Sequence, residues 1–350
     1  MTQAQNNIVV KKRYLFYISQ NYSFEILRPI QQQILSRGDE CAWFVEGSDV
    51  NLTFFRHNEQ RLKSIEEAIA FNPHAVFVPG NIVPDFIPGV KVQVFHGLEW
   101  KKKGHFSIRG FFDLYCTHGP ITTSRFNQMA KVARHFLVKE TGWPKLDPLF
   151  QIAPYSLQTE KPVVLFAPTF SPNLTCAPIL FEEIKRLVAT DEHFWLVKFH
   201  PKMNPDWIAK YHTIQADNYR VVDTDSCLPL LKRAHVLLSD TSSIIGEFLL
   251  LNKPAITFNN AAPGEYLINI QSVNQLNNAI NQALNNNTQL IQQITQANAQ
   301  LHPFTDGLSA QRVLAATDQL IAHRPATLKR KPLNLLRKFK IRKKLNYWKL

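Results

Sequence analysis

The stretch AHVLLSDTSSIIGEFLLL (residues 234–251) decides the fold class of this chain. An apolar run, a polar turn and a second apolar run follow one another, which predicts a buried strand, a turn and a helix. Ligands of open parallel sheets bind outside the carboxyl ends of the strands, so Ser242 lies where chemistry is expected. The stretch VQVFHG (residues 92–97) places His96 at a second such strand end. Their separation along the chain predicts two domains that face one cleft.

The same pattern recurs along most of the chain. Compact apolar runs that end in small or polar residues are typical of strands in parallel sheets, and helical patterns separate them here. The first series is RYLFYIS, CAWFV, HAVFVPG, VKVQVFHG and FDLYCTHG, and the second is PVVLFAPTF, HFWLVKFHP, YRVVD, AHVLLSD and PAITF. The sequence therefore predicts an α/β fold of two Rossmann-like domains.

Changes in composition set the predicted domain boundaries. The segment FQIAPYSLQTEKP (residues 150–162) loses periodicity and contains two prolines, which is typical of an interdomain connection. We expect a first domain over residues 1–150, a second over residues 160–323 and a basic aromatic tail over residues 324–350. Residues 271–300 are rich in Asn and Gln, but their apolar residues recur at helical spacing and predict two surface helices.

Length and composition indicate a cytoplasmic protein. The chain has 350 residues, of which 45% are hydrophobic, but none of its apolar runs reaches the roughly 18 residues of a membrane-spanning helix. The apolar run near the start is too short for a secretory signal. Cys41, Cys116, Cys176 and Cys227 are scattered, which indicates reduced, mostly buried thiols and no structural metal site.

The net charge of +13 is concentrated at the end of the chain. Eleven Lys and Arg residues and no acid lie in residues 324–350, which leaves about +2 for the rest and argues against a nucleic-acid partner. Aromatic and aliphatic residues alternate with these cations, which favours a peripheral anchor on an anionic membrane. On a helix, Ile341, Leu345 and Trp348 lie nearly opposite Leu335, Leu336 and Phe339, so amphipathicity is poor. A solvated basic tail therefore remains the alternative.

The polar turn of residues 239–243 predicts a diphosphate site. Free backbone N–H groups at a helix start, together with hydroxyls, bind anions. The turn contains Ser239, Asp240, Thr241, Ser242 and Ser243. Thr169, Lys198 and His200 follow neighbouring predicted strands, where the cations could neutralise phosphate. The alternatives are that Asp240 or Thr241 only caps the helix and that His200 only ends a strand.

His96 is the candidate general base. Gly97 permits a tight turn after the strand, and an imidazole titrates close enough to neutral pH for proton transfer. Lys101, Lys102 and Lys103 follow and could bind an acidic acceptor. A structural histidine and a solvated lysine cluster are the alternatives.

Asp223 and Asp225 are one residue apart and could share a divalent cation with a diphosphate. Spacing this short arises often by chance, and the N–H groups of the polar turn make a metal less necessary. We expect no metal site and no bound cofactor.

Over residues 75–315 the chain resembles the CDP-glycerol glycerophosphotransferases, which are the teichoic-acid primases and polymerases. The shared fragments occur in the family's order. They are His96-Gly97 with the following lysines, Tyr115 to Gly119, Gly142 to Asp147, Ala167-Pro168-Thr169, Lys198-Phe199-His200-Pro201, Ser239 to Ser243 and Asp306-Gly307. The resemblance implies the glycosyltransferase-B architecture of two Rossmann-like domains.

The resemblance also implies an activity. It is transfer of a polyol phosphate, with glycerol phosphate expected first, from a CDP-activated donor to a hydroxyl of a lipid-linked or glycan acceptor, with release of CMP. His96 matches the family's base and His200 its second essential histidine. Residues 241–243 match the diphosphate-binding turn, and Glu247 lies where related enzymes hold the ribose. The enzyme is expected at the inner face of the plasma membrane, with the CDP donor as a substrate and no divalent metal required.

Two departures from the family concern the ligand contacts. Thr241 stands where the family usually has Tyr, and Leu98, Glu99 and Trp100 follow His96-Gly97 where a small residue or Thr-Pro is usual. Two alternative functions remain open. One is a glycosyltransferase of the same architecture that uses a nucleotide sugar, because the fold does not separate the two reactions. The other is a noncatalytic nucleotide-binding factor in polysaccharide assembly.

Overall fold

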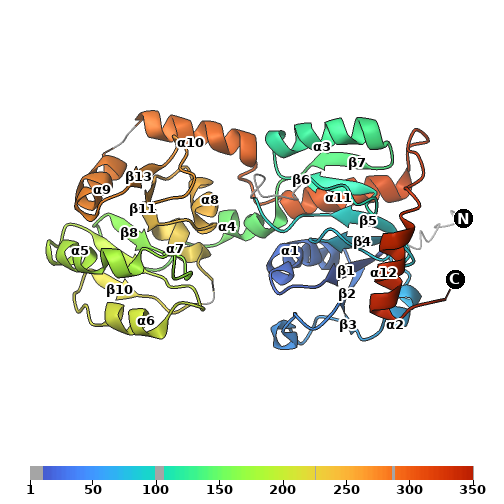
Figure 1. Cartoon of the computed structure of the whole chain (residues 1–350), viewed down its shortest axis with the longest axis horizontal. Coiled ribbons are helices and arrows are strands. Elements are labelled where there is room, and N and C mark those ends of the chain that lie inside the picture. Colours follow the sequence, from blue (N-terminus) through green and yellow to red (C-terminus); the bar gives the residue numbers. More distant parts are fainter. Residues whose placement is uncertain (1–10, 99–105, 225, 286–287, 350) are drawn as a thin grey trace, which may run out of the picture. The chain divides into compact units, whose positions relative to one another are not determined.

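The computed structural model describes residues 11–98, 106–224, 226–285 and 288–349, which form two compact units (Figure 1). Unit 1 contains residues 1–147 and 301–350, and unit 2 contains residues 148–300. The chain leaves unit 1 in α4 (Asp147–Gln151) and returns at the end of α10 (Thr288–Leu301).

Unit 1 is built on a parallel sheet of seven strands among the described residues, in the order β3-β2-β1-β4-β5-β6-β7. The apolar runs are buried on both faces, as expected for a sheet covered by helices on either side. The strands are β1 (Arg13–Ile18), β2 (Glu40–Val45), β3 (Arg61–Leu62), β4 (Ala75–Val78), β5 (Val90–Gln93), β6 (Leu114–Thr117) and β7 (Leu137–Glu140).

Helices cover this sheet with apolar residues at helical spacing. In α1, for example, Ile26, Leu27, Ile30 and Ile34 are buried on one side of the helix. The helices are α1 (Ser23–Ser36), α2 (Ile65–Ala70), α3 (Pro120–Ala133), α11 (Ser309–Ala322) and α12 (Leu335–Leu345), with short 3-10 turns η1 (Leu52–Phe54) and η2 (Pro144–Leu146).

Unit 2 repeats the architecture with a parallel sheet in the order β10-β9-β8-β11-β12-β13. Its strands are β8 (Val163–Phe166), β9 (Phe194–Val197), β10 (Tyr219–Val221), β11 (Val236–Ser239), β12 (Ala255–Phe258) and β13 (Ile268–Ile270). Its remaining helices are α5 (Ala177–Ala189), α6 (Pro205–His212), α7 (Leu228–Arg233), α8 (Ile244–Leu249), η3 (Val273–Gln275) and α9 (Leu276–Leu284). The two Rossmann-like units confirm the predicted fold class.

The domain bounds differ from the sequence-based prediction of a second domain over residues 160–323. Residues 301–323 belong to unit 1 because polar contacts fasten them there. The Asp147 carboxylate accepts from the backbone N–H groups of Ser309 (2.9 Å) and Ala310 (2.7 Å) at the start of α11. In addition, the Tyr14 hydroxyl donates to Asp318 of α11 (2.6 Å). Figure 1 accordingly shows the red α11 among the blue and cyan elements of unit 1.

The fragment Gly142 to Asp147 forms the other side of the contact between residues 301–323 and the rest of unit 1. The backbone N–H of Trp143 donates to Nε2 of the buried His302 (2.8 Å). Gly142 has φ +77, and a Cβ there would lie 2.5 Å from Ser309 Oγ, so only glycine fits. This family fragment therefore holds the returning chain in unit 1.

The basic tail of residues 324–350 packs on unit 1 through α12. Ile341 is buried in the core of this unit, and the Tyr347 ring stacks on Phe86 at a centroid distance of 4.5 Å. Lys338 pairs with Asp85 (3.1 Å) and Lys344 with Glu46 (2.6 Å). The tail is therefore a docked helix, and the alternative of a freely solvated segment does not describe it.

The two sides of α12 separate largely as expected. Leu335, Leu336 and Phe339 are exposed, whereas Ile341 and Leu345 pack on unit 1. The placement of Trp348 with Ile341 and Leu345 was wrong. The helix ends at Leu345 and turns through the left-handed Asn346, so the Trp348 ring lies 5.4 Å from Phe339 on the exposed side. Across the described part of the chain, every helix is too short or too polar to span a membrane.

Candidate functional site

The predicted nucleotide residues of unit 2 follow the two strands at the switch point of its sheet. The chain runs from β8 outward through β9 to β10, and then from β11 outward in the other direction through β12 to β13. Thr169 follows β8 and the turn of residues 239–243 follows β11, and β8 and β11 are parallel neighbours. Ligands of open α/β sheets bind at such a point.

Asp240 is the buried centre of this switch point, with 1% of its surface exposed. Both carboxylate oxygens accept from the Thr169 N–H (3.1 Å each), and one also accepts from the Cys176 N–H (3.1 Å). Burial raises the pKa of Asp240, while these N–H bonds act in the opposite direction. The side chain fixes the loop after β8, and it can affect a ligand only through that loop.

Ser239 has a similar internal role. Its hydroxyl is fully buried and donates to the Ala167 carbonyl (2.6 Å), which ties β11 to the end of β8. The alternative that Asp240 or Thr241 caps α8 is wrong, because Ser243 is the residue before the helix and makes no capping side-chain bond. Thr241 Oγ1 instead accepts from the Ala261 N–H (3.2 Å).

Thr241, Ser242 and Ser243 form the accessible part of the turn. The first two are half-buried and Ser243 is exposed. The helix that follows has only six residues, so anion binding here depends on the N–H groups and hydroxyls of the turn more than on a long helix dipole. This part of the turn can bind a phosphate group.

Lys198 and His200 follow β9, the neighbour of β8. The exposed His200 ring stacks on Phe170 at 4.3 Å, and its Nδ1 accepts from the Lys202 N–H (3.1 Å). With Nδ1 as an acceptor, the neutral ring carries its proton on Nε2. Partial burial and the Lys202 and Lys198 cations lower the pKa of His200. At neutral pH the ring is therefore a neutral donor, oriented by its contacts and suited to a phosphate oxygen.

Glu247 lies half-buried on α8. It and Lys198 act in opposite directions on the pKa of the Cys227 thiol, which burial raises to about 12, so the three side chains lie near one another. The thiol stays protonated and is no nucleophile. Glu247 thus shares its surroundings with Lys198.

In unit 1, His96 is exposed beyond the end of β5. The strand is shorter than expected because Phe95 adopts the left-handed region, with φ +58, and turns its ring into the core. The Trp143 indole N–H donates to the Phe95 carbonyl (3.4 Å), and the His96 ring lies 5.8 Å from Tyr22. This turn presents an accessible imidazole. Lys101, Lys102 and Lys103 lie outside the described residues.

The described residues contain no cluster of three or more His, Cys, Asp or Glu side chains that could hold a metal ion. Of the pair considered as a metal motif, Asp225 lies outside the described residues.

Comparisons with known proteins point to one family. The family model described as CDP-Glycerol:Poly(glycerophosphate) glycerophosphotransferase matches residues 110–317. The teichoic acid glycerol-phosphate primase of Bacillus subtilis (strain 168) is 27% identical over 164 residues, which cover 43% of this chain and 42% of that protein. The match therefore spans less than half of the length of that relative.

Solved structures share the fold. The wall teichoic acid polymerase TagF, also solved after a soak with CDPG, has a TM-score of 0.63 and 14% identity, with 89% of each chain covered. A UDP-N-acetylglucosamine 2-epimerase, described as putative, from Listeria monocytogenes has a TM-score of 0.64 and 15% identity, with 90% of this chain and 98% of that chain covered. At these identities the likeness shows the fold alone.

Proposed function

The chain belongs to the CDP-glycerol:poly(glycerophosphate) glycerophosphotransferase family and is a transferase, and on this premise we propose that it transfers glycerol phosphate from CDP-glycerol to an acceptor hydroxyl. The acceptor is a lipid-linked or surface glycan, and CMP is the second product. The reaction takes place at the cytoplasmic face of the membrane and requires no divalent metal.

The arrangement at the switch point of unit 2 carries the proposal. Asp240 holds the loops after β8 and β11 together through three contacts to backbone N–H groups. His200, next to them along the sheet, offers a neutral Nε2–H, and Lys198 adds a cation. Preformed donors and a positive charge suit the diphosphate of a CDP donor.

The proposed step is an in-line displacement at phosphorus. The acceptor oxygen forms a bond to the phosphorus distal to cytidine, while the bond from that phosphorus to the bridging oxygen breaks. The acceptor proton passes to His96, and CMP leaves with the electron pair of the broken bond. The N–H groups of residues 241–243, with Lys198 and His200, stabilise the charge that develops on CMP.

A thermal-shift panel tests the donor side without an acceptor. A ligand that binds the native state at 100 times its Kd stabilises it by about 2.7 kcal/mol. We expect stabilisation by CDP-glycerol, a smaller shift with CDP or CMP, and a loss of most of the CDP-glycerol shift in His200→Ala. His212→Ala is the matched control, because His212 is an exposed histidine at the end of α6.

Other outcomes of the panel separate the alternatives. If CDP-ribitol bound more tightly than CDP-glycerol, the proposed type of reaction would stand, with ribitol phosphate as the transferred group. Preference for UDP-sugars would contradict the proposal and favour a glycosyltransferase of the same fold. A protein that binds CDP-glycerol but never turns it over with any acceptor would be a noncatalytic factor.

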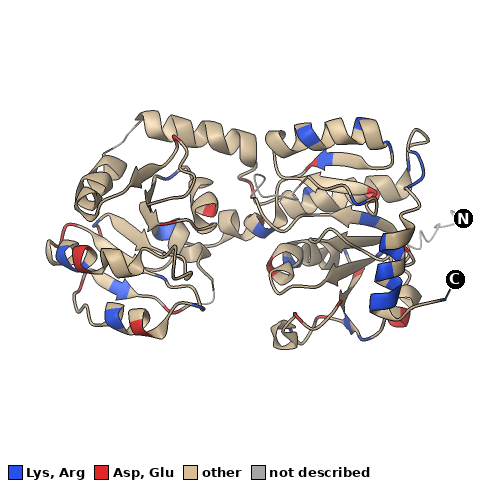
Figure 2. Cartoon of the chain, viewed as in Figure 1, with Lys and Arg blue, Asp and Glu red and all other residues tan. Residues whose placement is uncertain are grey.

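We further propose that α12 binds an anionic membrane surface. Its exposed side carries Leu335, Leu336 (81% exposed) and Phe339 (56% exposed) beside Arg337 and Lys340. Figure 2 shows the cations gathered along this helix. Each Lys or Arg near an anionic surface contributes roughly 1 kcal/mol, and the apolar side chains add burial in the headgroup region.

Vesicle sedimentation tests this contact on the full chain. Leu336→Glu/Phe339→Glu should reduce the fraction that pellets with phosphatidylglycerol vesicles several-fold, because it removes apolar contact and adds repulsion. Val132→Glu on α3 is the matched control, since Val132 is an equally exposed apolar residue of unit 1 (86% exposed). Equal pelleting of the double variant and the control would reject membrane binding through α12.

A further inference from the structure

Unit 1 has a cavity of about 190 Å³ at the switch point of its own sheet. The chain runs outward from β1 through β2 to β3, and then from β4 outward in the other direction. The cavity is lined by residues that follow β1, β2 and β4, among them Ser19, Glu46 and Asn81, and by Tyr17, Arg109 and Lys344. By the same topological rule as in unit 2, this is the ligand position of the first sheet.

One side of the cavity is lined by polar side chains. The Tyr17 side chain is 2% exposed, and its hydroxyl faces Glu46, which also lines the cavity. Burial, the Glu46 charge and a side-chain hydrogen bond to Glu46 raise the pKa of this hydroxyl, so it remains protonated. The Gln93 amide N–H donates to Asn81 Oδ1, so Asn81 can offer its NH₂ group to a ligand. Polar groups that converge on a cavity favour a polar ligand.

The other side is cationic and is built by the C-terminal segment. Lys344 of α12 reaches the cavity and pairs with the buried Glu46 (2.6 Å). Asn334 donates through Nδ2 to the Arg109 carbonyl (2.6 Å), and Pro332 packs so closely on Gly110 that a Cβ there would lie 2.6 Å from its ring. Lys344, one of the two cations of the cavity, therefore belongs to the C-terminal segment. The same segment holds the backbone of Arg109, the other cation.

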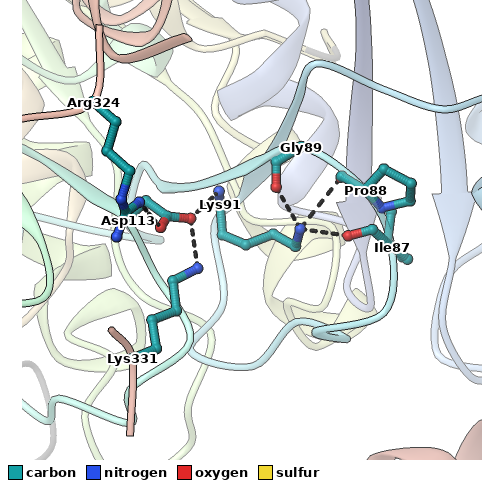
Figure 3. A network of polar contacts seen from close by, with 7 residues as sticks. All are labelled: Ile87, Pro88, Gly89, Lys91, Asp113, Arg324 and Lys331. Atoms are coloured by element: carbon teal, nitrogen blue, oxygen red, sulfur yellow. Dashed lines mark hydrogen bonds and ion pairs between the residues drawn. The ribbon is translucent and has the colours of Figure 1, made fainter. Parts of the chain in front are cut away.

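A buried network fixes the beginning of this segment (Figure 3). Asp113 accepts from Arg324 (2.9 Å), from Lys331 (2.5 Å) and from the backbone N–H of Lys91 (2.8 Å). Burial alone would raise the pKa of Asp113, but Lys331 and the other donors hold it below its usual value. The Lys91 ammonium group donates to the carbonyls of residues 87–89. This anchoring makes the tail a fixed wall of the cavity.

The cavity also lies beside the candidate base. Tyr22 lines it, and the Tyr22 ring lies 5.8 Å from the ring of His96. Its size suits a small ligand, its hydroxyl, amide and carboxylate groups suit a polyol, and Arg109 and Lys344 suit one phosphate.

We propose that this cavity binds the terminal polyol phosphate unit of the acceptor and directs its free hydroxyl towards His96. The C-terminal segment is then part of the acceptor site. This assignment rests on the proposed function, which supplies the reason for a phosphorylated polyol as acceptor.

Binding of glycerol 3-phosphate to the full chain tests the assignment, with glycerol and inorganic phosphate as separate arms. Saturation-transfer NMR titrations should show tighter binding of glycerol 3-phosphate than of either fragment. Tyr17→Phe and Lys344→Met should each weaken it about tenfold, the equivalent of one hydrogen bond to a charged group. Lys338→Met is the matched control, because Lys338 also pairs α12 with an acid of unit 1 but does not line the cavity.

Tyr17→Phe keeps the test independent of folding, because Phe retains the buried ring and only the hydroxyl is removed. Affinities unchanged in both cavity variants would overturn the assignment, as would binding of inorganic phosphate as tight as that of glycerol 3-phosphate. Thermal shifts with CDP-glycerol on the same proteins separate the two proposals. A normal CDP-glycerol shift together with unchanged glycerol 3-phosphate binding in the cavity variants would reject the cavity assignment alone. Glycerol 3-phosphate binding that depends on the cavity residues, without any CDP-glycerol shift, would reject the proposed donor and with it the acceptor role, and would leave a polyol phosphate site in unit 1.

Discussion

At the scale of single residues, the polar turn after β11 divides into supporting and accessible positions. Ser239 and Asp240 are buried and hold neighbouring loops, whereas Thr241, Ser242 and Ser243 remain at least partly accessible. Five consecutive polar residues after an apolar run predicted a functional turn. They could not show which side chains point inward, because that depends on the loop after β8, which is about 70 residues away in sequence.

Asp240 gives a prediction at this scale. Asn replaces one of the two acceptor oxygens by an NH₂ donor, so Asp240→Asn removes at least one accepted hydrogen bond and places a donor close to the backbone N–H of Thr169 or Cys176. We expect a loss of about 2 kcal/mol in the free energy of unfolding, measured by urea denaturation, and weaker CDP-glycerol binding. Asp217→Asn, at an exposed acid of the same unit, should change stability little. Equal stability of the two variants would mean that these contacts contribute nothing.

At the scale of elements, apolar runs identified most strands correctly, including β1, β2, β4 and β6 in unit 1. The edge strands β3, β7 and β13 escaped prediction because they are short, only partly buried and carry polar residues. The placement of α11 could not be predicted from its own pattern. It depends on the Asp147 carboxylate at its first turn and on His302 just before it.

The contact between His302 and the backbone N–H of Trp143 makes the stability of unit 1 depend on pH. Burial lowers the pKa of this fully buried imidazole to about 4, from 6.5 in an exposed histidine. Below pH 6.5 the unfolded chain binds a proton at this position while the folded chain does not, so its contribution falls as the pH decreases from 6.5 to about 4. The shift corresponds to about 3 kcal/mol.

Urea denaturation between pH 7 and pH 4.5 measures this dependence. His302→Gln keeps an acceptor for the Trp143 N–H but does not titrate, so the wild-type protein should lose more stability than the variant over this range. The difference between the two proteins isolates His302 from the other histidines. Identical pH profiles would show that His302 is not held neutral.

At the scale of the whole molecule, each unit has polar groups gathered at the switch point of its own sheet. Unit 2 offers N–H groups, His200 and Lys198, and unit 1 offers a cavity beside His96. The sequence predicted both sheets and the strand ends with these residues. It did not predict the cavity, because Lys344 lines it from the far end of the chain and Asn334, from the same segment, holds the backbone of Arg109. The tail was expected to bind a membrane, which stays a prediction, and in the structure it packs on unit 1 and lines the cavity through Lys344.

The products of a single turnover test the proposed reaction most directly. Full-length protein is incubated with CDP-glycerol and a lipid acceptor that ends in glycerol phosphate, and both products are measured by mass spectrometry. We expect one CMP for each glycerol phosphate added, and a decrease of about 100-fold or more in His96→Ala without loss of CDP-glycerol binding. Release of CDP with transfer of glycerol alone, or full turnover in His96→Ala, would contradict the proposed reaction.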